Sequence, residues 1–124
     1  MDNLSDTEHL LQNITAGHRV YVEGYKHEGV PILLTEFGGI AYDKTNEVGW
    51  GYTSVTSEEQ FLKDYRRIMD AIYHSKTLHG YCYTQLSDVE QEMNGLLDFD
   101  HHPKVDPDKI KEINDMWHST MVIQ

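Results

Sequence analysis

Residues 31–39 read Pro-Ile-Leu-Leu-Thr-Glu-Phe-Gly-Gly, an apolar run that ends in a carboxylate and two glycines. Three consecutive apolar residues, 32–34, are typical of a strand that is buried on both faces. Thr35 and Glu36 then stand at the C-terminal end of this strand, where parallel α/β folds bind ligands and carry out chemistry. The two glycines allow the chain to turn sharply beside the carboxylate. Glu36 is therefore either a functional carboxylate or an ordinary polar residue that ends a strand.

Residues 78–85, Leu-His-Gly-Tyr-Cys-Tyr-Thr-Gln, predict a second central strand. Small Gly80 and Cys82 alternate with tyrosines, which suits the tapered interior of a barrel. We therefore expect Cys82 to be a small, buried core residue. The polar end of this strand, residues 84–85, corresponds to residues 35–36 of the first strand.

Helices are predicted from capping signals and apolar periodicity. Residues 56–59 have capping-box spacing, and the helix after them carries an apolar stripe at helical spacing. The stripe consists of Phe61, Leu62, Tyr65, Ile68, Met69 and Ile72. Residues 106–107, Asp-Pro, should begin the last helix. We also expect a short helix from the capping box at residues 5–8 to near Gly17, and a weak strand at residues 19–22.

The stretch from residue 37 to residue 55 is rich in glycine and aromatic residues and lacks periodicity, so we expect a long structured loop. The predicted order is strand, long loop, helix, strand, loop, helix. Alternating strands and helices imply a parallel sheet. Two strands that each end in polar residues and lead into a loop follow the plan of the (β/α)₈ barrel, whose active site is formed by such loops.

The composition bounds the class of function. Hydrophobic residues make up 39% and charged residues 25% of the 124 residues, which fits one soluble globular domain without a membrane span. The single cysteine and an N-terminus unlike a signal peptide predict a cytoplasmic location. The formal net charge of −11 disfavours nucleic acid as a partner and favours a neutral or cationic ligand. Solubility alone would also explain this charge.

Three segments resemble the catalytic barrel of glycoside hydrolase family 2, the β-galactosidase-, β-glucuronidase- and β-mannosidase-like enzymes. They are residues 34–41 (Leu-Thr-Glu-Phe-Gly-Gly-Ile-Ala), residues 80–96 (Gly-Tyr-Cys-Tyr-Thr-Gln-Leu-Ser-Asp-Val-Glu-Gln-Glu-Met-Asn-Gly-Leu) and residues 103–107 (Pro-Lys-Val-Asp-Pro). Their order and spacing are similar to the C-terminal end of that barrel. The resemblance implies an α/β fold, the C-terminal portion of a (β/α)₈ TIM barrel, with residues 1–124 as a single partial domain. The chain would contain about the last two strand-helix units of the barrel, preceded by a short strand and helix.

By this resemblance Glu36 corresponds to the catalytic nucleophile of a retaining β-glycosidase. Such an enzyme also needs a second carboxyl group about 5–5.5 Å away, acting first as acid and then as base. In the family this group belongs to an Asn-Glu pair at the end of the fourth strand, which would lie before residue 1. The chain contains Asn46-Glu47, but this pair follows the nucleophile and is out of order, so we interpret it as a coincidence.

Further residues are candidates for contact with a β-glycoside. Trp50 is a candidate sugar-stacking residue, with packing inside its own loop as the alternative. Gln85 and Asp88 are placed to line the same pocket. We expect no cofactor and no metal, because the adjacent residues His101 and His102 do not match a known ligand spacing.

The length of the chain sets a limit on this interpretation. A (β/α)₈ barrel takes about 250 residues, and the two predicted strands would have edges that barrel closure normally removes. The chain is then an excised fragment, a naturally short reading frame, or a chain that self-associates. We expect a homo-oligomer or association with the remainder of the barrel. The prediction is a nucleophile-bearing fragment that is inactive alone; the alternative is a non-catalytic carbohydrate-binding or assembly module.

Overall fold

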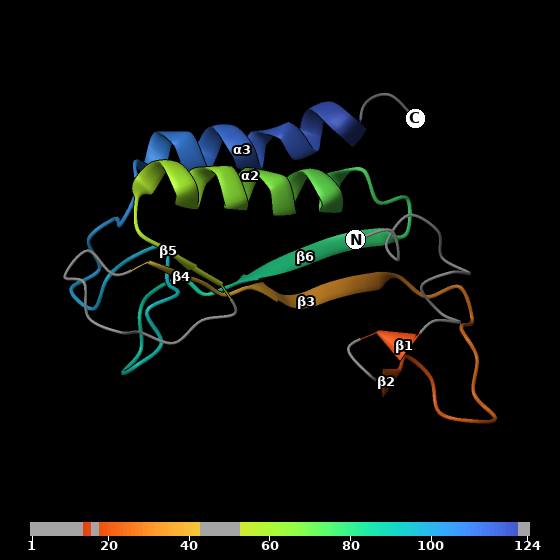
Figure 1. Ribbon diagram of the computed structural model, residues 1–124. Coiled ribbons are helices and arrows are strands. Elements are labelled where there is room, and N and C mark those ends of the chain that lie inside the picture. The colour runs from red at the N-terminus through yellow and green to blue at the C-terminus, as the bar shows by residue number, and fades with distance from the viewer. Residues whose placement is uncertain (1–13, 16–17, 43–52, 122–124) are drawn as a thin grey trace.

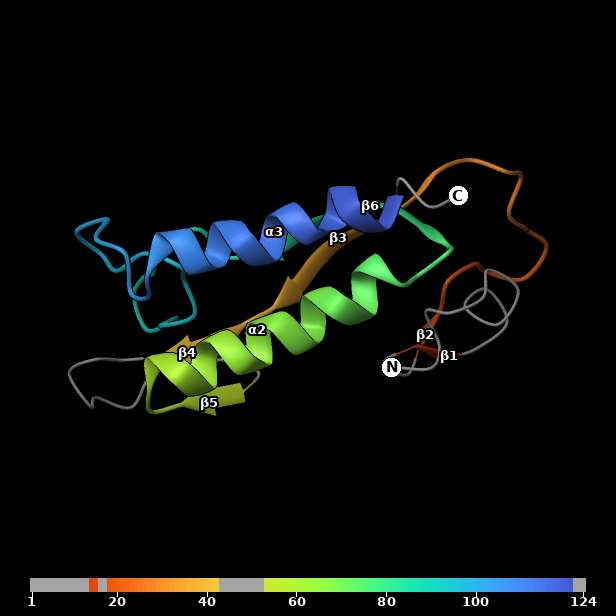
Figure 2. The same cartoon turned by 90° about the horizontal axis from the view of Figure 1, so that it is seen from above.

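The computed structural model describes residues 14–15, 18–42 and 53–121. Two helices lie side by side over one face of a pair of long strands (Figures 1 and 2). The elements are β1 (Ile14–Thr15), β2 (His18–Arg19), β3 (Ile32–Gly38), β4 (Ile40–Tyr42), β5 (Thr53–Val55), α2 (Glu58–Tyr73), β6 (Leu78–Thr84) and α3 (Pro107–Met121). None of the described helices is both long enough and apolar enough to cross a membrane.

The described strands form three pairs. β3 pairs with β6 in parallel, β4 pairs with β5 in parallel, and β1 pairs with β2 antiparallel. The β3–β6 register runs from Ile32 opposite Leu78 to Gly38 opposite Thr84. The predicted α/β class with parallel pairing of the two central strands is therefore confirmed.

The expected loop over residues 37–55 is wrong at both ends, because β4 and β5 lie within it. All three residues of β4 are buried, and they pair with β5 under the start of α2. Residues 43–52 lie outside the described part of the chain, as do residues 1–13, where the first helix was expected.

The weak strand expected at residues 19–22 is also corrected. The strand β2 covers only His18–Arg19, and the chain turns after it. Residues 14–15, placed within the end of the first helix by the capping signal, form β1 instead. Both strands have two residues, too few for the alternation of polar and apolar side chains to identify a strand.

Both predicted helix starts are found, one of them displaced by a residue. The N-cap of α2 is Ser57, whose hydroxyl accepts a hydrogen bond from the Gln60 N–H at 3.2 Å. Gln60 Oε1 accepts from the Thr56 N–H at 3.0 Å, so the capping pair begins one residue later than predicted. Asp106 caps α3 through a 3.0 Å hydrogen bond from the Asp108 N–H.

The core lies between the two helices and the face of the β3–β6 pair that they cover. Phe37 meets Tyr81 and Tyr83 edge-on, with ring centroids 5.9 and 5.5 Å apart. From α2, the ring of Tyr65 packs edge-on against Tyr83 at 5.1 Å, and its hydroxyl donates to Asn114 Oδ1 of α3 at 2.9 Å. The predicted apolar stripe of α2 thus faces the sheet, with Phe61, Tyr65, Met69 and Ile72 fully buried.

The opposite face of the β3–β6 pair is open over the described residues. The side chain of Leu33 is 57% exposed, and Cys82 is exposed as well. The prediction that Cys82 is buried is wrong, because the helices cover only the face that carries Tyr81 and Tyr83. Parallel sheets are normally covered on both faces, so this open face is unusual for the class.

The buried tyrosines predict loss of stability at alkaline pH. Burial raises the pKa of Tyr65 to about 12 and raises the pKa values of Tyr73 and Tyr83 further. The folded chain therefore keeps these protons at a pH where the unfolded chain loses them. Stability should be complete below about pH 10 and fall as the pH rises toward 12. Melting temperatures measured by circular dichroism at increasing pH should show this decrease.

Two tyrosine variants control this measurement. Tyr65→Phe should make the alkaline decrease shallower, since it removes one of the raised pKa values. Tyr25→Phe should leave the slope unchanged, because Tyr25 is 74% exposed. Equal slopes in all three proteins would contradict the assignment to the buried tyrosines.

Candidate active site

The carboxyl ends of β3 and β6 meet at one edge of the parallel pair. Phe37 lies opposite Tyr83, and the Gly39 N–H donates to the Thr84 carbonyl at 2.9 Å just beyond the strands. Glu36 precedes Phe37, and Gln85 follows Thr84. β3 continues to Gly38, so Glu36 lies two residues before the end of its strand and not at the end as expected, while Gln85 directly follows β6. Both residues therefore lie near the carboxyl ends of two adjacent strands, where open α/β sheets bind ligands.

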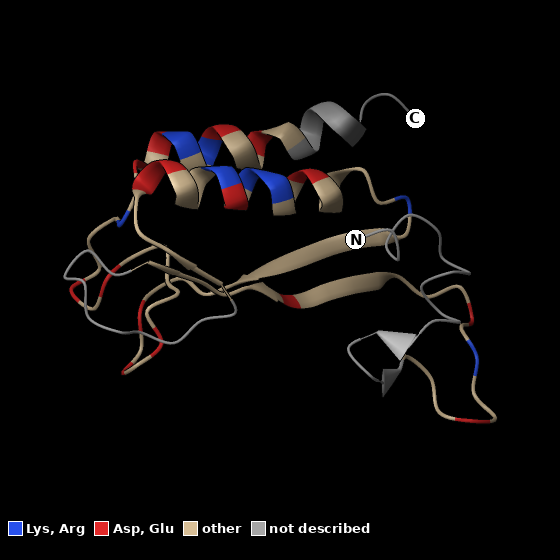
Figure 3. Cartoon of the chain, in the orientation of Figure 1, with Lys and Arg blue, Asp and Glu red and all other residues tan. Residues whose placement is uncertain are grey.

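Glu36 lies in a local irregularity of β3. The register shifts between Leu34 and Phe37, so Thr35 and Glu36 have no register partners on β6. Glu36 is exposed, and it is the one charged residue in β3 and β6, since histidine is counted as neutral (Figure 3). Within the described ranges, no hydrogen bond or ion pair engages the Glu36 carboxylate. The carboxylate is therefore available to an incoming ligand.

The turn after Glu36 requires glycine for two independent reasons. Gly38 has a φ of +104°, a conformation that residues with side chains rarely adopt. A Cβ atom at this position would also lie 2.2 Å from Cε2 of Tyr83. The backbone beside Glu36 therefore packs directly against the aromatic core, and this contact links the position of the carboxylate to the packing of β6.

Gly38→Ala should lower the free energy of unfolding by roughly 2–4 kcal/mol, the sum of backbone strain and overpacking. Gly29→Ala is the matched control, because Gly29 also has a positive φ of 79° but nothing lies within 4 Å of its added Cβ. That variant should lose only about 1 kcal/mol. Urea denaturation measures both, and equal losses would contradict the close contact with Tyr83.

Gln85 is held by the loop that follows β6. Its Nε2 donates to Asn94 Oδ1 at 2.6 Å and to Glu92 Oε2 at 3.3 Å. The peptide bond between Thr84 and Gln85 is cis. Asn94 is buried, and its Nδ2 has no hydrogen-bond partner in the described part of the chain. Contact between Gln85 and a sugar stays a prediction. The Nε2 atom of Gln85 already donates hydrogen bonds to Asn94 and Glu92 of the loop.

Asp88 occupies a different place from the one predicted. We expected it to line a substrate pocket, but its side chain is 2% exposed and pairs with Lys104, whose side chain is 3% exposed. Lys104 Nζ lies 2.9 and 3.0 Å from the two carboxylate oxygens and 2.8 Å from the Met93 carbonyl. The Gly95 N–H donates to the same carboxylate at 2.8 Å. Asp88 therefore stabilises the loop between β6 and α3 through buried contacts with Gly95 and Lys104.

Lys104 was not identified from the sequence, although it lies in the third segment of the resemblance. A fully buried lysine is rare unless it is paired, and its partner lies 16 residues away in the sequence. The ion pair joins the residues just after β6 to those just before α3. This connection fixes the loop that carries the contacts of Gln85.

The loop also contains a group of polar residues around His102, of which Asp98 is half-buried and Asp100 and His102 are exposed. Asp98, Asp100 and His102 each offer one side-chain atom that could bind a metal ion, and these atoms lie within 4.8 Å of one another. Asp98 Oδ1 accepts hydrogen bonds from the N–H groups of Asp100 and His102, both at 2.9 Å, and the His102 bond leads the causes that hold the pKa of Asp98 below its usual value. This carboxylate stabilises a turn. His102 is oriented towards Asp98, with its Nδ1 3.6 Å from Oδ2.

The remaining residues from the sequence prediction cannot be placed. Trp50 and the Asn46-Glu47 pair lie within residues 43–52, outside the described ranges. The stacking role of Trp50 therefore stays a prediction, and Glu36 and Gln85 define the described site.

Two comparisons with known proteins bear on this site. No protein-family model matches this chain, and a search of curated proteins finds no match. The likeness to glycoside hydrolase family 2 therefore rests on the three sequence segments alone.

Proposed function

We propose that this chain is the nucleophile-bearing part of a retaining β-glycosidase of the β-galactosidase-like kind. The observation that carries the proposal is the exposed Glu36 carboxylate at the carboxyl end of a parallel strand pair, next to a glycine turn. A carboxylate in this place can attack an anomeric carbon and form a covalent glycosyl ester. The three segments that resemble glycoside hydrolase family 2 support the choice of this reaction.

The second carboxyl group of the reaction would come from outside this chain. The resemblance assigns it to an Asn-Glu pair on a fourth barrel strand, before residue 1. It would protonate the leaving group and then activate the water that hydrolyses the ester. The isolated chain is therefore expected to lack turnover, while Glu36 retains its place at the strand end.

The proposed fold is the C-terminal portion of a (β/α)₈ barrel. Three features support it: β3 and β6 are parallel neighbours, each is followed along the chain by a helix, and both helices lie on one face. The exposed face with Leu33 and Cys82 would then face the barrel interior. In a complete barrel this interior is filled by side chains from all the strands.

The proposal predicts that the isolated chain associates. Over the described residues, each long strand has a single neighbour, and open strand edges promote pairing between chains. Size-exclusion chromatography with light scattering should show a species larger than the monomer. A stable monomer at every concentration would contradict this expectation.

The exposed face of the β3–β6 pair is also compatible with two other functions. The chain is alternatively a non-catalytic carbohydrate-binding or assembly module, or a fragment that complements a truncated partner. Nitrophenyl galactoside hydrolysis by the chain alone, and by the chain mixed with the missing barrel part, separates these functions. Turnover only in the mixture supports a nucleophile-bearing chain, either as a piece of one enzyme or as a complementing fragment, and excludes the non-catalytic module. Galactoside binding without turnover in either case supports the binding module.

A further inference from the structure

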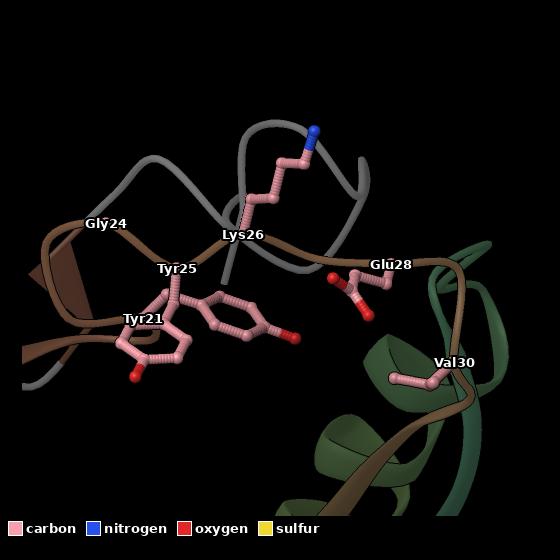
Figure 4. Close-up of a pocket in the computed structure, with 6 residues that line it drawn as sticks. All are labelled: Tyr21, Gly24, Tyr25, Lys26, Glu28 and Val30. Carbon is pink, nitrogen blue, oxygen red and sulfur yellow. The ribbon is translucent and has the colours of Figure 1, made fainter.

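A hollow lies near the amino-terminal end of β3, away from Glu36. Its volume is about 830 Å³, within the range of small-molecule sites. It is lined by Tyr21, Gly24, Tyr25, Lys26, Glu28 and Val30 (Figure 4). Val30 precedes Glu36 by six residues, which corresponds to roughly 20 Å of extended chain. The hollow is therefore separate from the site around Glu36.

The two tyrosines of this hollow are positioned by local contacts. The Tyr25 N–H donates to the Val22 carbonyl at 3.1 Å and closes a turn, in which Gly24 has a φ of +89°. The Tyr21 hydroxyl lies 3.4 Å from His27 Nδ1, and the two rings pack at a centroid distance of 6.4 Å. The turn and the histidine contact together place both phenol rings beside the hollow.

The charges around the hollow favour a cation. Figure 4 shows the Tyr25 hydroxyl, the Glu28 carboxylate and the Val30 side chain pointing toward the hollow, while the Lys26 ammonium points away. The hollow therefore offers aromatic surface and a carboxylate, with the nearby lysine charge directed elsewhere. The net charge of −11 for the whole chain adds a long-range preference for positive ligands.

We propose that this hollow binds an organic cation of the alkylated-ammonium or guanidinium class. The cation would lie beside the Tyr21 and Tyr25 side chains, which can attract positive charge, with Glu28 as its counter-ion. Val30 would contact the apolar part of the ligand. This site does not depend on Glu36 or on glycosidase activity, so it can be tested on the isolated chain.

Calorimetric titration with choline and with neohexanol, its uncharged isostere, tests the proposal. Choline should bind saturably, and neohexanol should bind at least roughly tenfold more weakly, because it lacks the charge that the rings and Glu28 recognise. Absence of saturable choline binding would overturn the proposal. Equal affinity for the two compounds would overturn it as well, and so would binding of galactose in place of choline.

Variants locate the binding site. Tyr25→Ala and Glu28→Gln should each weaken choline binding by roughly tenfold. Glu23→Gln is the matched control, since Glu23 is an exposed carboxylate in the same turn that does not line the hollow. Unchanged affinity in Glu28→Gln, or an equal loss in Glu23→Gln, would overturn the assignment. Circular dichroism checks that each variant is folded. If Tyr25→Ala does not fold, the affinity of Glu28→Gln for choline alone tests the assignment.

Discussion

Under the proposed function, replacing Glu36 by glutamine in a complete protein that contains residues 1–124 is expected to lower kcat for β-glycoside hydrolysis by at least about 10⁴-fold, the scale of loss when a covalent catalyst is removed. The amide cannot form the glycosyl ester, so the two-step route through a covalent intermediate is closed. The change keeps the size of the side chain. Because Glu36 is exposed, stability should change little. Steady-state kinetics with a nitrophenyl galactoside measures the effect.

Two further variants show whether the loss is specific. Glu59→Gln makes the same chemical change at an exposed position in the first turn of α2 and should leave kcat unchanged. Glu36→Ala with added azide should form a glycosyl azide of inverted configuration, since azide can enter where the carboxylate was removed. A Glu36→Gln enzyme with near-normal kcat would exclude Glu36 as the nucleophile.

Replacing Lys104 by methionine is expected to lower the free energy of unfolding by about 3–5 kcal/mol. The ammonium group binds both oxygens of the buried Asp88 carboxylate. Without it, the Gly95 N–H would be the remaining hydrogen-bond donor to this carboxylate among the described residues. Burying a charge without its counter-ion is among the largest single-residue penalties in proteins. Urea denaturation monitored by circular dichroism provides the measurement.

Lys109→Met is the matched control for this prediction. Lys109 lies 3.7 Å from Glu58 in a pair whose side chains are 56% and 41% exposed, so its loss should change stability by at most about 1 kcal/mol. Replacing Asp88 by leucine together with Lys104→Met should recover part of the loss, because no buried charge is then left unpaired. Equal effects of Lys104→Met and Lys109→Met would contradict the buried pair.

The long elements could be predicted because they carry a strong local pattern. Residues 61–72 repeat apolar side chains at helical spacing, and residues 32–34 and 78–85 have the composition of strands. The expected burial of residues 32–34 on both faces is wrong, because Leu33 lies on the open face and is 57% exposed. The short strands β4 and β5 were missed because three residues are too few for periodicity to identify a strand. Cys82 was misplaced for another reason: its alternation with tyrosines identifies two faces of the strand, but says nothing about what covers each face.

The candidate site could be predicted only where its residues follow directly from a strand. Glu36 lies two residues before the end of β3 and Gln85 directly follows β6, and pairing of two parallel strands brings such residues to one edge. Asp88 has no such constraint, because its environment depends on Lys104 and on the Met93 carbonyl, contacts that arise only when the loop folds. The lack of register partners for Thr35 and Glu36 likewise depends on how β3 pairs with β6.

Trapping the covalent intermediate would identify the nucleophile directly. A 2-deoxy-2-fluoro-β-galactosyl fluoride carries a leaving group that needs little acid assistance, so labelling reports the nucleophile. The complete protein that contains residues 1–124 would be incubated with this reagent, digested and analysed by mass spectrometry. We expect a stoichiometric fluorogalactosyl ester on Glu36 and loss of activity at the same rate. Labelling of a different carboxylate, with Glu36 unmodified, would contradict it.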